Sequence, residues 1–115
     1  MKNIVTLKNS REFGKVYNRK ESFANKYLVM YISANNLEYS RIGISVSKKV
    51  GNSVVRHRIT RLIRESYRLQ EERFQSGIDL VVIARGAAKD ASYHEIESAM
   101  MHLAKLHKIE MFEND

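Results

Sequence analysis

Apolar residues recur with a period of two in two stretches of the chain, and this alternation predicts β-strands over residues 27–34 and 41–47. The first stretch has an aliphatic face of Leu28, Met30 and Ile32, while its other face carries Tyr27, Val29 and Tyr31. Turn-forming residues at 35–38 separate the two stretches, which favours their pairing as an antiparallel hairpin. Residues 78–84 are apolar on both faces, as is typical of an interior strand. A short strand is also predicted near 22–24.

Three other stretches repeat their apolar residues with a period near 3.6, which predicts helices over 10–19, about 53–74 and a segment beginning near Ser92. The residues in position to cap them are Asn9, Asn52 and Ser92. Glu12 and Glu95 follow the first and third caps by three residues, as in a capping box. The predicted core positions of the second and third helices are Val55, Ile59, Leu62, Ile63 and Leu69, and Ile96, Ala99, Met100, Leu103 and Leu106. The element order αβββαβα indicates an α+β sandwich of two layers, with helices packed on a small sheet.

Length and composition narrow the class of protein. A chain of 115 residues, 43% of them hydrophobic, is enough for one domain over residues 1–115. The chain has no Cys, which excludes disulfides and thiolate chemistry. It has no apolar run long enough to span a membrane, and the N-terminal residues turn polar too early for a signal peptide. We therefore expect a cytoplasmic protein.

Charge is distributed very unevenly along the chain. Residues 1–68 contain 15 Lys and Arg against 4 Asp and Glu, a net charge of +11, whereas residues 69–115 contain 5 against 9, a net charge of −4. One face of the folded chain is therefore strongly basic, which favours a polyanion as the partner.

The helix predicted after Asn52 carries much of this positive charge. On a helical wheel, His57, Arg58, Arg61, Arg64 and Arg68 fall within an arc of about 120° opposite the core positions. Arg56 lies in the first turns, beside Lys48 and Lys49 of the preceding loop. A solvated helix face would mix signs, yet only Glu65 interrupts this one. Arginine also favours bidentate phosphate recognition, so the pattern predicts binding to RNA or DNA.

Aromatic residues form a second group of candidates. Phe13, Tyr17, Tyr27 and Tyr31 are expected at the junction of the first helix with the sheet, next to the basic Arg11, Lys15 and Arg19. Aromatic side chains beside basic ones suit the unstacked bases of a single strand. Core packing explains Phe13 equally well. Tyr31 is the stronger candidate, because the opposite face of its strand already supplies the core.

These two groups of residues occur together in a known family. The segment 45–65, SVSKKVGNSVVRHRITRLIRE, closely resembles the signature of the bacterial ribonuclease P protein subunit. Phe13, Tyr17 and the stretches 23–26 and 81–85 are also similar to that family, so the resemblance covers nearly the whole chain. The family usually has Asn and Lys where this chain has His57 and Thr60.

The resemblance implies both a fold and a function. The fold would be the ribosomal protein S5 domain 2-like sandwich with a left-handed βαβ crossover, which the general right-handed preference does not predict. The function would be to assist a catalytic RNA subunit in removing the 5′ leader from precursor tRNA. The resemblance assigns binding of the RNA subunit to Lys48, Lys49, Asn52, Arg56, Arg58, Arg61, Arg64 and Arg68. It assigns a cleft for the leader to Arg11, Phe13, Lys15, Tyr17, Tyr27 and Tyr31.

The sequence offers no catalytic group of its own. Carboxylates of the basic half are spread over separate elements, and the histidines 94, 102 and 107 do not share a helix face. We therefore expect no cofactor on the protein, with Mg²⁺ supplied to the complex through RNA, and no obligate protein partner. The alternative is a stand-alone nucleic-acid-binding module, either ribosome-associated or regulatory. A membrane-surface helix is excluded, because the apolar arc of the basic helix is needed for the core.

Overall fold

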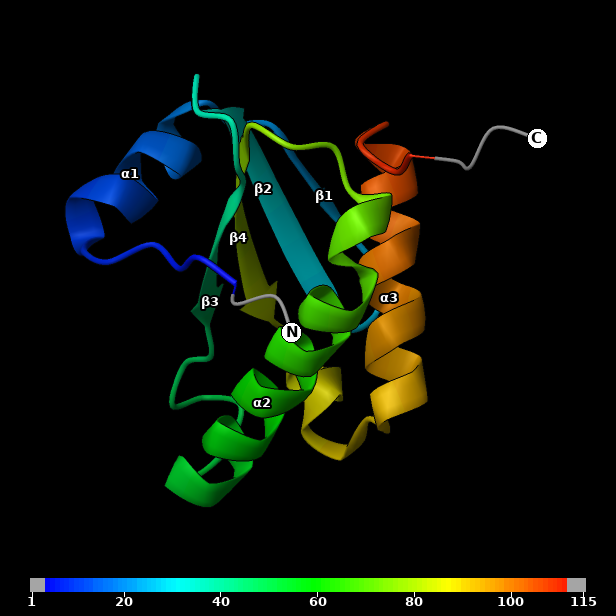
Figure 1. Ribbon diagram of the computed structural model, residues 1–115. Coiled ribbons are helices and arrows are strands. Elements are labelled where there is room, and N and C mark those ends of the chain that lie inside the picture. The colour runs from blue at the N-terminus through cyan, green and yellow to red at the C-terminus, as the bar shows by residue number, and fades with distance from the viewer. Residues whose placement is uncertain (1–3, 112–115) are drawn as a thin grey trace.

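The computed structural model describes residues 4–111, in which three helices surround a four-stranded sheet (Figure 1). The elements are α1 (Ser10–Asn18), β1 (Ser22–Ala24), β2 (Leu28–Ala34), β3 (Arg41–Ser45), α2 (Ser53–Gln70), β4 (Ile78–Ala84) and α3 (Tyr93–Leu106), with short 3₁₀ turns at Glu71–Arg73 and Gly86–Asp90. This order confirms the predicted α+β class and the short strand β1. The ends of the predicted domain, 1–3 and 112–115, lie outside the described residues. No helix within residues 4–111 is long and apolar enough to cross a membrane.

The sheet order is β1-β2-β4-β3, and the predicted hairpin of β2 with β3 is therefore wrong. β4 lies between them, antiparallel to β2 and parallel to β3. The reason is that β4 is apolar on both faces and so is most stable in the centre, where both of its faces are covered. Residues 35–40 are enough to carry the chain past one intervening strand. The outer edge of β3 is partly covered by the N-terminal segment, where Leu7 N–H donates to the Ile42 carbonyl at 2.9 Å.

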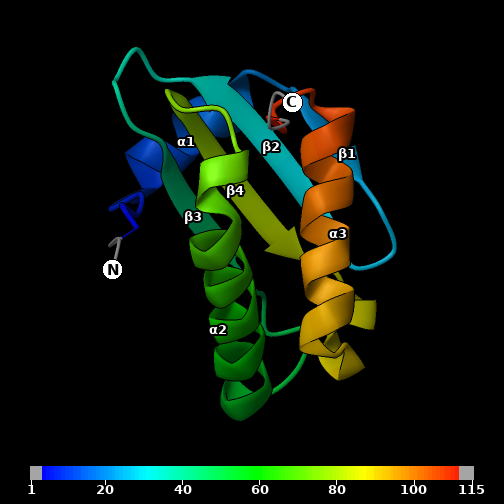
Figure 2. The ribbon, with the colours of Figure 1, turned by 45° about the vertical axis from the view of Figure 1, so that its right-hand side comes forward.

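α2 connects the parallel strands β3 and β4 across one face of the sheet. Figure 2 shows α2 in front of the sheet, with both strands running downward and β4 to the right of β3. This arrangement is a left-handed crossover, opposite to the general preference. The resemblance predicted this hand, and general folding rules did not.

The main core fills the space between this face and the helices α2 and α3. It contains inward-facing residues of three strands, such as Met30, Ile42 and Leu80, and the fully buried Ile63 and Met100. Leu69 and Leu106, both predicted as core, are instead 56% and 38% exposed. The last residue of α2, Gln70, donates from its side chain to Glu97 of α3 at 3.0 Å, and the buried positions in the last turns of α2 are Ser66 and Tyr67.

The predicted caps are present at all three helices. Asn9, Asn52 and Ser92 each accept a hydrogen bond from the backbone N–H three residues later. Ser92 and Glu95 form a complete capping box. Glu12 differs from the prediction, because its carboxylate accepts from Lys8 N–H rather than from the cap. α2 also ends earlier than predicted, at Gln70, and continues as a 3₁₀ turn to Arg73.

Candidate nucleic-acid interface

The basic face of α2 is only partly free to meet a ligand. Lys48 and Lys49 in the loop before α2, and Arg61 and Arg64 on the helix, are exposed. Asn52 is exposed at the first turn, with its carbonyl oxygen committed to the Val55 N–H at 3.0 Å. The N-terminus of α2, the two lysines before it and the exposed arginines along the helix form a surface that suits phosphate groups.

Three other arginines of the predicted set are held by neighbouring groups. Arg58 donates to the carbonyls of Ala91 at 2.6 Å and Lys89 at 3.3 Å, and so ties α2 to the segment before α3. Arg56 donates from Nε to the Gly51 carbonyl at 3.2 Å, and Arg68 donates from Nε to Glu65 at 2.7 Å. The sequence analysis assigned all of these arginines to RNA binding, whereas the structure shows that Arg58 also contacts the protein backbone. The Thr60 hydroxyl donates to the Arg56 carbonyl at 2.9 Å, and His57 is exposed.

Aromatic side chains gather on the opposite face of the sheet, where α1 packs. Tyr17 of α1 and Tyr31 of β2 meet edge to face, with ring centroids 5.0 Å apart and an interplanar angle of 87°. With Phe13 they are half-buried around a small core of Leu7, Val16 and Val81. Burial, and secondarily the nearby Tyr31, raises the pKa of Tyr17, so its phenol stays protonated. We call Phe13, Tyr17 and Tyr31 the aromatic face.

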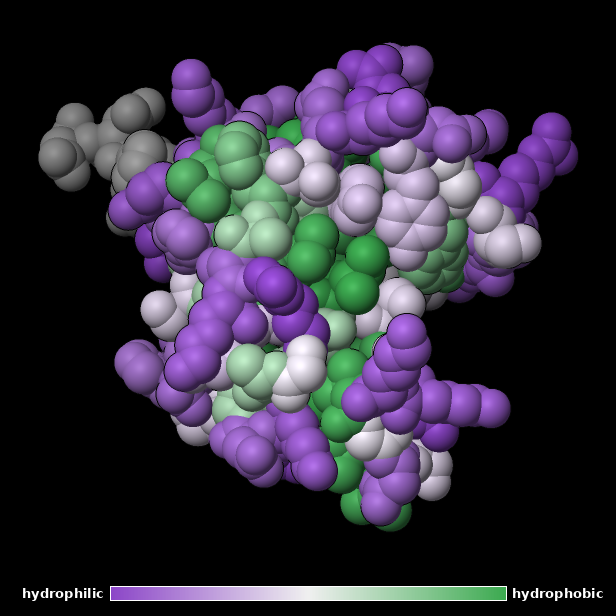
Figure 3. Space-filling model, turned by 180° about the vertical axis from the view of Figure 1, so that it is seen from behind, coloured by the Kyte–Doolittle hydropathy of each residue, from purple (hydrophilic) through white to green (hydrophobic). Residues whose placement is uncertain are grey.

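Figure 3 shows the molecule from behind the view of Figure 1, with a band of hydrophobic and weakly polar residues bordered by hydrophilic side chains. Arg11 and Lys15 are exposed on α1, the helix that carries Phe13 and Tyr17. The structure therefore brings together the basic and aromatic residues of α1 and β2 that the sequence predicted, apart from Tyr27.

Tyr27 does not belong to this face, and its predicted position is wrong. It precedes β2 and packs against the main core on the α3 side of the sheet. Its hydroxyl donates to Glu95 of α3 at 2.7 Å, and this hydrogen bond is the main cause of the raised pKa of Tyr27. The alternation of side chains between the two faces holds only within β2, which begins at Leu28. It therefore placed Tyr31 correctly but did not predict the position of Tyr27.

Gly43 shapes the aromatic face, and the sequence analysis did not single it out. A Cβ atom at this position would lie 2.5 Å from Cζ of Phe13 and 3.0 Å from Cδ1 of Leu7. Only glycine therefore lets the Phe13 ring pack directly on β3. The available signal was a lone glycine inside an apolar strand, which often marks such a close approach.

A narrow groove connects the aromatic face with the basic helix. Its volume is about 170 Å³, and it is lined by Phe13, Gly43 and Ile44 on one side and by Thr60 and Arg64 of α2 on the other. The groove runs past the β3 edge of the sheet. Arg64 is thus the exposed arginine of α2 nearest to Phe13 along this groove.

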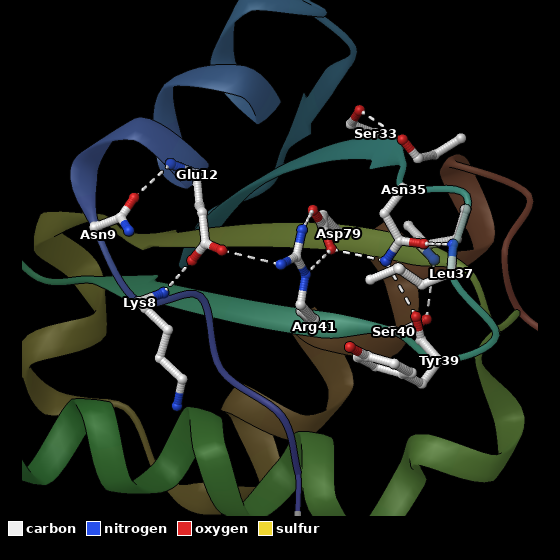
Figure 4. Close-up of polar contacts among 12 residues, drawn as sticks. Lys8, Asn9, Glu12, Ser33, Asn35, Leu37, Tyr39, Ser40, Arg41 and Asp79 are labelled. Atoms are coloured by element: carbon white, nitrogen blue, oxygen red, sulfur yellow. Dashed lines mark hydrogen bonds and ion pairs between the residues drawn. The ribbon is translucent and has the colours of Figure 1, made fainter.

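A partly buried ion-pair network links α1 to the sheet (Figure 4). Arg41 of β3 donates to both carboxylate oxygens of Asp79 in β4, at 2.9 and 2.7 Å, and to Glu12 of α1 at 3.0 Å. Asp79 is buried and also accepts from the Asn35 side chain at 2.8 Å. The hydrogen bond to Asp79 raises the pKa of Arg41, so its charge is permanent. The network sets the position from which Phe13 and Tyr17 extend.

Within residues 4–111, no three His, Asp or Glu side chains converge in a way that could hold a metal ion. The described residues offer an extended basic surface and a separate aromatic surface. Such a combination on an α+β sandwich defines a small binding protein for an extended, charged ligand.

Comparison with known proteins identifies the family. Residues 1–108 match the family model described as Ribonuclease P, and the chain belongs to this family. It is 65% identical over 104 residues to the ribonuclease P protein component of Lachnoclostridium phytofermentans, with 90% of each chain covered. The structure of the Staphylococcus aureus RNase P protein is similar with a TM-score of 0.84 and 35% identity, covering 93% of this chain and 98% of that one. The RNase P protein of Thermotoga maritima gives a TM-score of 0.81 and 26% identity, covering 95% and 98%. The chain is therefore a ribonuclease P protein component, which acts in tRNA processing as part of a ribonucleoprotein endoribonuclease.

Proposed function

We propose that the chain binds the RNA subunit through the exposed cations of α2 and of the loop before it, and holds the 5′ leader of precursor tRNA on the aromatic face. The observation that supports this division is the placement of the two surfaces on opposite faces of one sheet. Lys48, Lys49, Arg61 and Arg64 offer charge without stacking surface, so they suit the phosphates of a folded RNA. The half-buried rings of α1 and β2 offer flat surfaces to unstacked bases.

The catalytic centre, on this proposal, lies in the RNA subunit. The described residues provide no fitting site for the Mg²⁺ that the family implies, so no step of the reaction is assigned to a metal on this chain. The place of action is the cytoplasm, where the precursor tRNA is made. Protein freed of RNA should leave precursor tRNA uncut, and leader removal should begin when the RNA subunit is added. Processing by the RNA-free protein would contradict this assignment.

Two variants test the division of tasks. Tyr31→Leu keeps apolar volume against Tyr17 but removes the flat ring, and should weaken binding of precursor tRNA by the assembled enzyme by about 1–3 kcal/mol. The affinity for mature tRNA without a leader should be nearly unchanged. Arg61→Gln should instead weaken assembly with the RNA subunit, because a phosphate contact gives affinity rather than choice of substrate.

The measurement is a pair of titrations, with precursor and leaderless tRNA, on wild type and both variants. A thermal melt of each variant separates loss of fold from loss of binding. Equal weakening of both tRNAs by Tyr31→Leu would mean that Tyr31 is only part of the core.

A further inference from the structure

The turn between β4 and α3 lies beside the basic helix but belongs to neither of the proposed RNA surfaces. It is the 3₁₀ turn Gly86–Asp90, which packs against α2 next to the start of α3 (Figure 1). The turn falls in the acidic part of the sequence, since residues 69–115 carry a net charge of −4. The stretch 85–90 is nevertheless basic, because it contains Arg85 and Lys89 against one acid, Asp90. The average charge of residues 69–115 therefore conceals a local group of cations beside α2.

Arg58 of α2 holds this turn by its backbone. The two terminal nitrogens of the half-buried guanidinium donate to the carbonyls of Lys89 at 3.3 Å and of Ala91 at 2.6 Å. A carbonyl oxygen has no net charge, so these hydrogen bonds leave the positive charge of Arg58 uncompensated. The backbone of Lys89 therefore lies within hydrogen-bonding distance of a second cation.

The turn is also anchored in the protein interior, which gives the backbone of Lys89 a defined position. Ala88 and Ala91 lie on either side of Lys89 and Asp90, and both alanines are buried in the main core. Ala88 N–H donates to the Arg85 carbonyl at 2.9 Å, and Ala91 N–H donates to the Ala88 carbonyl at 3.1 Å. Lys89 and Asp90 are exposed, and neither forms an ion pair with another residue of the range 4–111. A cation on a fixed backbone loses less conformational freedom when it binds a ligand.

We propose that Lys89 binds phosphate groups of the RNA subunit and that Arg58 positions it for this contact. The inference rests on the proposed function, in which the exposed cations of α2 bind that RNA. Arg61 is one of those cations and lies one helical turn after Arg58, so Arg58 joins Lys89 to the same basic surface. The RNA surface thus extends from α2 onto the β4–α3 turn. Phosphate contacts on two elements define the orientation of a folded RNA on the protein.

The position of the turn favours the RNA subunit over the leader as the partner. Ala88 and Ala91 belong to the core between the sheet and the helices α2 and α3, whereas the aromatic face surrounds the small core on the other side of the sheet. A leader held on the aromatic face is therefore separated from Lys89 by the sheet.

The first test measures assembly of the full chain with the RNA subunit at four salt concentrations and constant Mg²⁺. Lys89→Gln should weaken assembly and reduce the slope of log affinity against log salt by about 1, the effect of losing one phosphate contact. Asp90→Asn should strengthen assembly, because a carboxylate next to Lys89 repels phosphate. Lys105→Gln is the matched control, since this exposed lysine lies about 18 Å along α3 from the start of the helix and should leave the slope unchanged.

The result for Arg61→Gln separates this inference from the proposed function. A reduced slope for Arg61→Gln with an unchanged slope for Lys89→Gln would overturn the inference alone. Unchanged slopes for both variants would overturn the RNA surface on α2 as well. An equal reduction by Lys105→Gln would mean that RNA responds only to the net charge of the protein. If Lys89→Gln weakened binding of precursor tRNA by the assembled enzyme and left assembly unchanged, the RNA subunit would be the wrong partner.

The second test distinguishes positioning from charge at Arg58. Arg58→Lys keeps the charge but replaces the planar fork by a single ammonium group, which cannot hold the two carbonyls in the same way. Lys89→Gln should therefore weaken assembly less in the Arg58→Lys protein than in wild type, because Lys89 has already lost its fixed position. Melting curves establish the temperature at which all four proteins of this cycle are folded, and assembly is measured there. A merely structural role of Arg58 would lower the melting temperature but leave the two effects on assembly additive, and additive effects would overturn the positioning of Lys89 by Arg58.

Discussion

Because Gly43 has no side chain, the Phe13 ring of the aromatic face can pack directly against β3. Because a Cβ atom would collide with the Phe13 ring at 2.5 Å, glycine at this position and the ring of Phe13 depend on each other. Gly14, on α1 beside Phe13, is different, since a Cβ atom there would meet nothing within 4 Å. A substitution at Gly14 therefore serves as a matched control for the same substitution at Gly43.

Gly43→Ala should destabilise the protein by about 1–2 kcal/mol, because overpacking forces the Phe13 ring to move. Gly14→Ala should stabilise it by about 0.5–1 kcal/mol, because alanine favours the helix and fits without contact. Urea denaturation of both variants measures the two free energies of unfolding. Adding Phe13→Leu to Gly43→Ala should recover part of the loss. A neutral effect of Gly43→Ala would mean that the ring is not held against β3.

At the scale of single residues, residue type alone did not distinguish the arginines that contact other parts of the protein from those that face solvent. The helical wheel correctly placed Arg58 and Arg61 on the polar side of α2, and both remain candidates for RNA contact. It could not show that Arg58 reaches the Ala91 carbonyl, because that contact is between residues 33 positions apart in the sequence. Tertiary position, rather than propensity, distinguishes an arginine that holds the fold from one that faces solvent.

Among the elements, α1 is attached to the sheet partly by an ion-pair network. α1 packs on the sheet through a small core of Leu7, Val16 and Val81, so the bridge from Glu12 through Arg41 to Asp79 is a substantial part of its attachment. The Asp79 side chain is only 8% exposed. Removing its partner would leave a charge buried without compensation.

Arg41→Met should therefore lower the free energy of unfolding by about 3 kcal/mol. Arg19→Met removes the exposed pair with Glu21, where both side chains are more than half accessible, and should cost less than about 1 kcal/mol. Urea denaturation of the two variants compares them directly. Adding Asp79→Asn to Arg41→Met should restore part of the stability. Equal effects of the two arginine variants would contradict a special role for the network.

The elements themselves were largely predictable, whereas their pairing was not. Caps at Asn9, Asn52 and Ser92 and the period of each apolar pattern are local properties, and the sequence contains them directly. The placement of β4 between β2 and β3 depends on which strand gains most from cover on both faces. That comparison involves the whole sheet, so a rule about neighbouring strands gave the wrong partner for β3. Tyr27 was misplaced for a similar reason, since its partner Glu95 lies on α3.

For the whole molecule, the separation of charge is the property that governs binding. The first 68 residues carry a net charge of +11 and the remainder −4. The structure places the exposed cations Lys48 and Lys49 before the N-terminal end of α2, and the acidic residues Glu71 and Glu72 directly after its C-terminal end. A polyanion therefore meets the protein in one preferred orientation.

Binding to the RNA subunit should fall steeply with salt, because each phosphate contact releases condensed counterions. With six or so contacts, affinity should fall about a thousandfold between 50 and 200 mM salt. Arg61→Gln should reduce the slope of log affinity against log salt by about 1, since it removes one exposed cation from the RNA surface. Arg73→Gln removes the same charge at the acidic end, where Arg73 is paired with Glu110, and should leave the slope unchanged. Filter-binding titrations at four salt concentrations give the three slopes. Equal slopes for wild type and Arg61→Gln would mean that α2 presents its arginines to solvent rather than to phosphate.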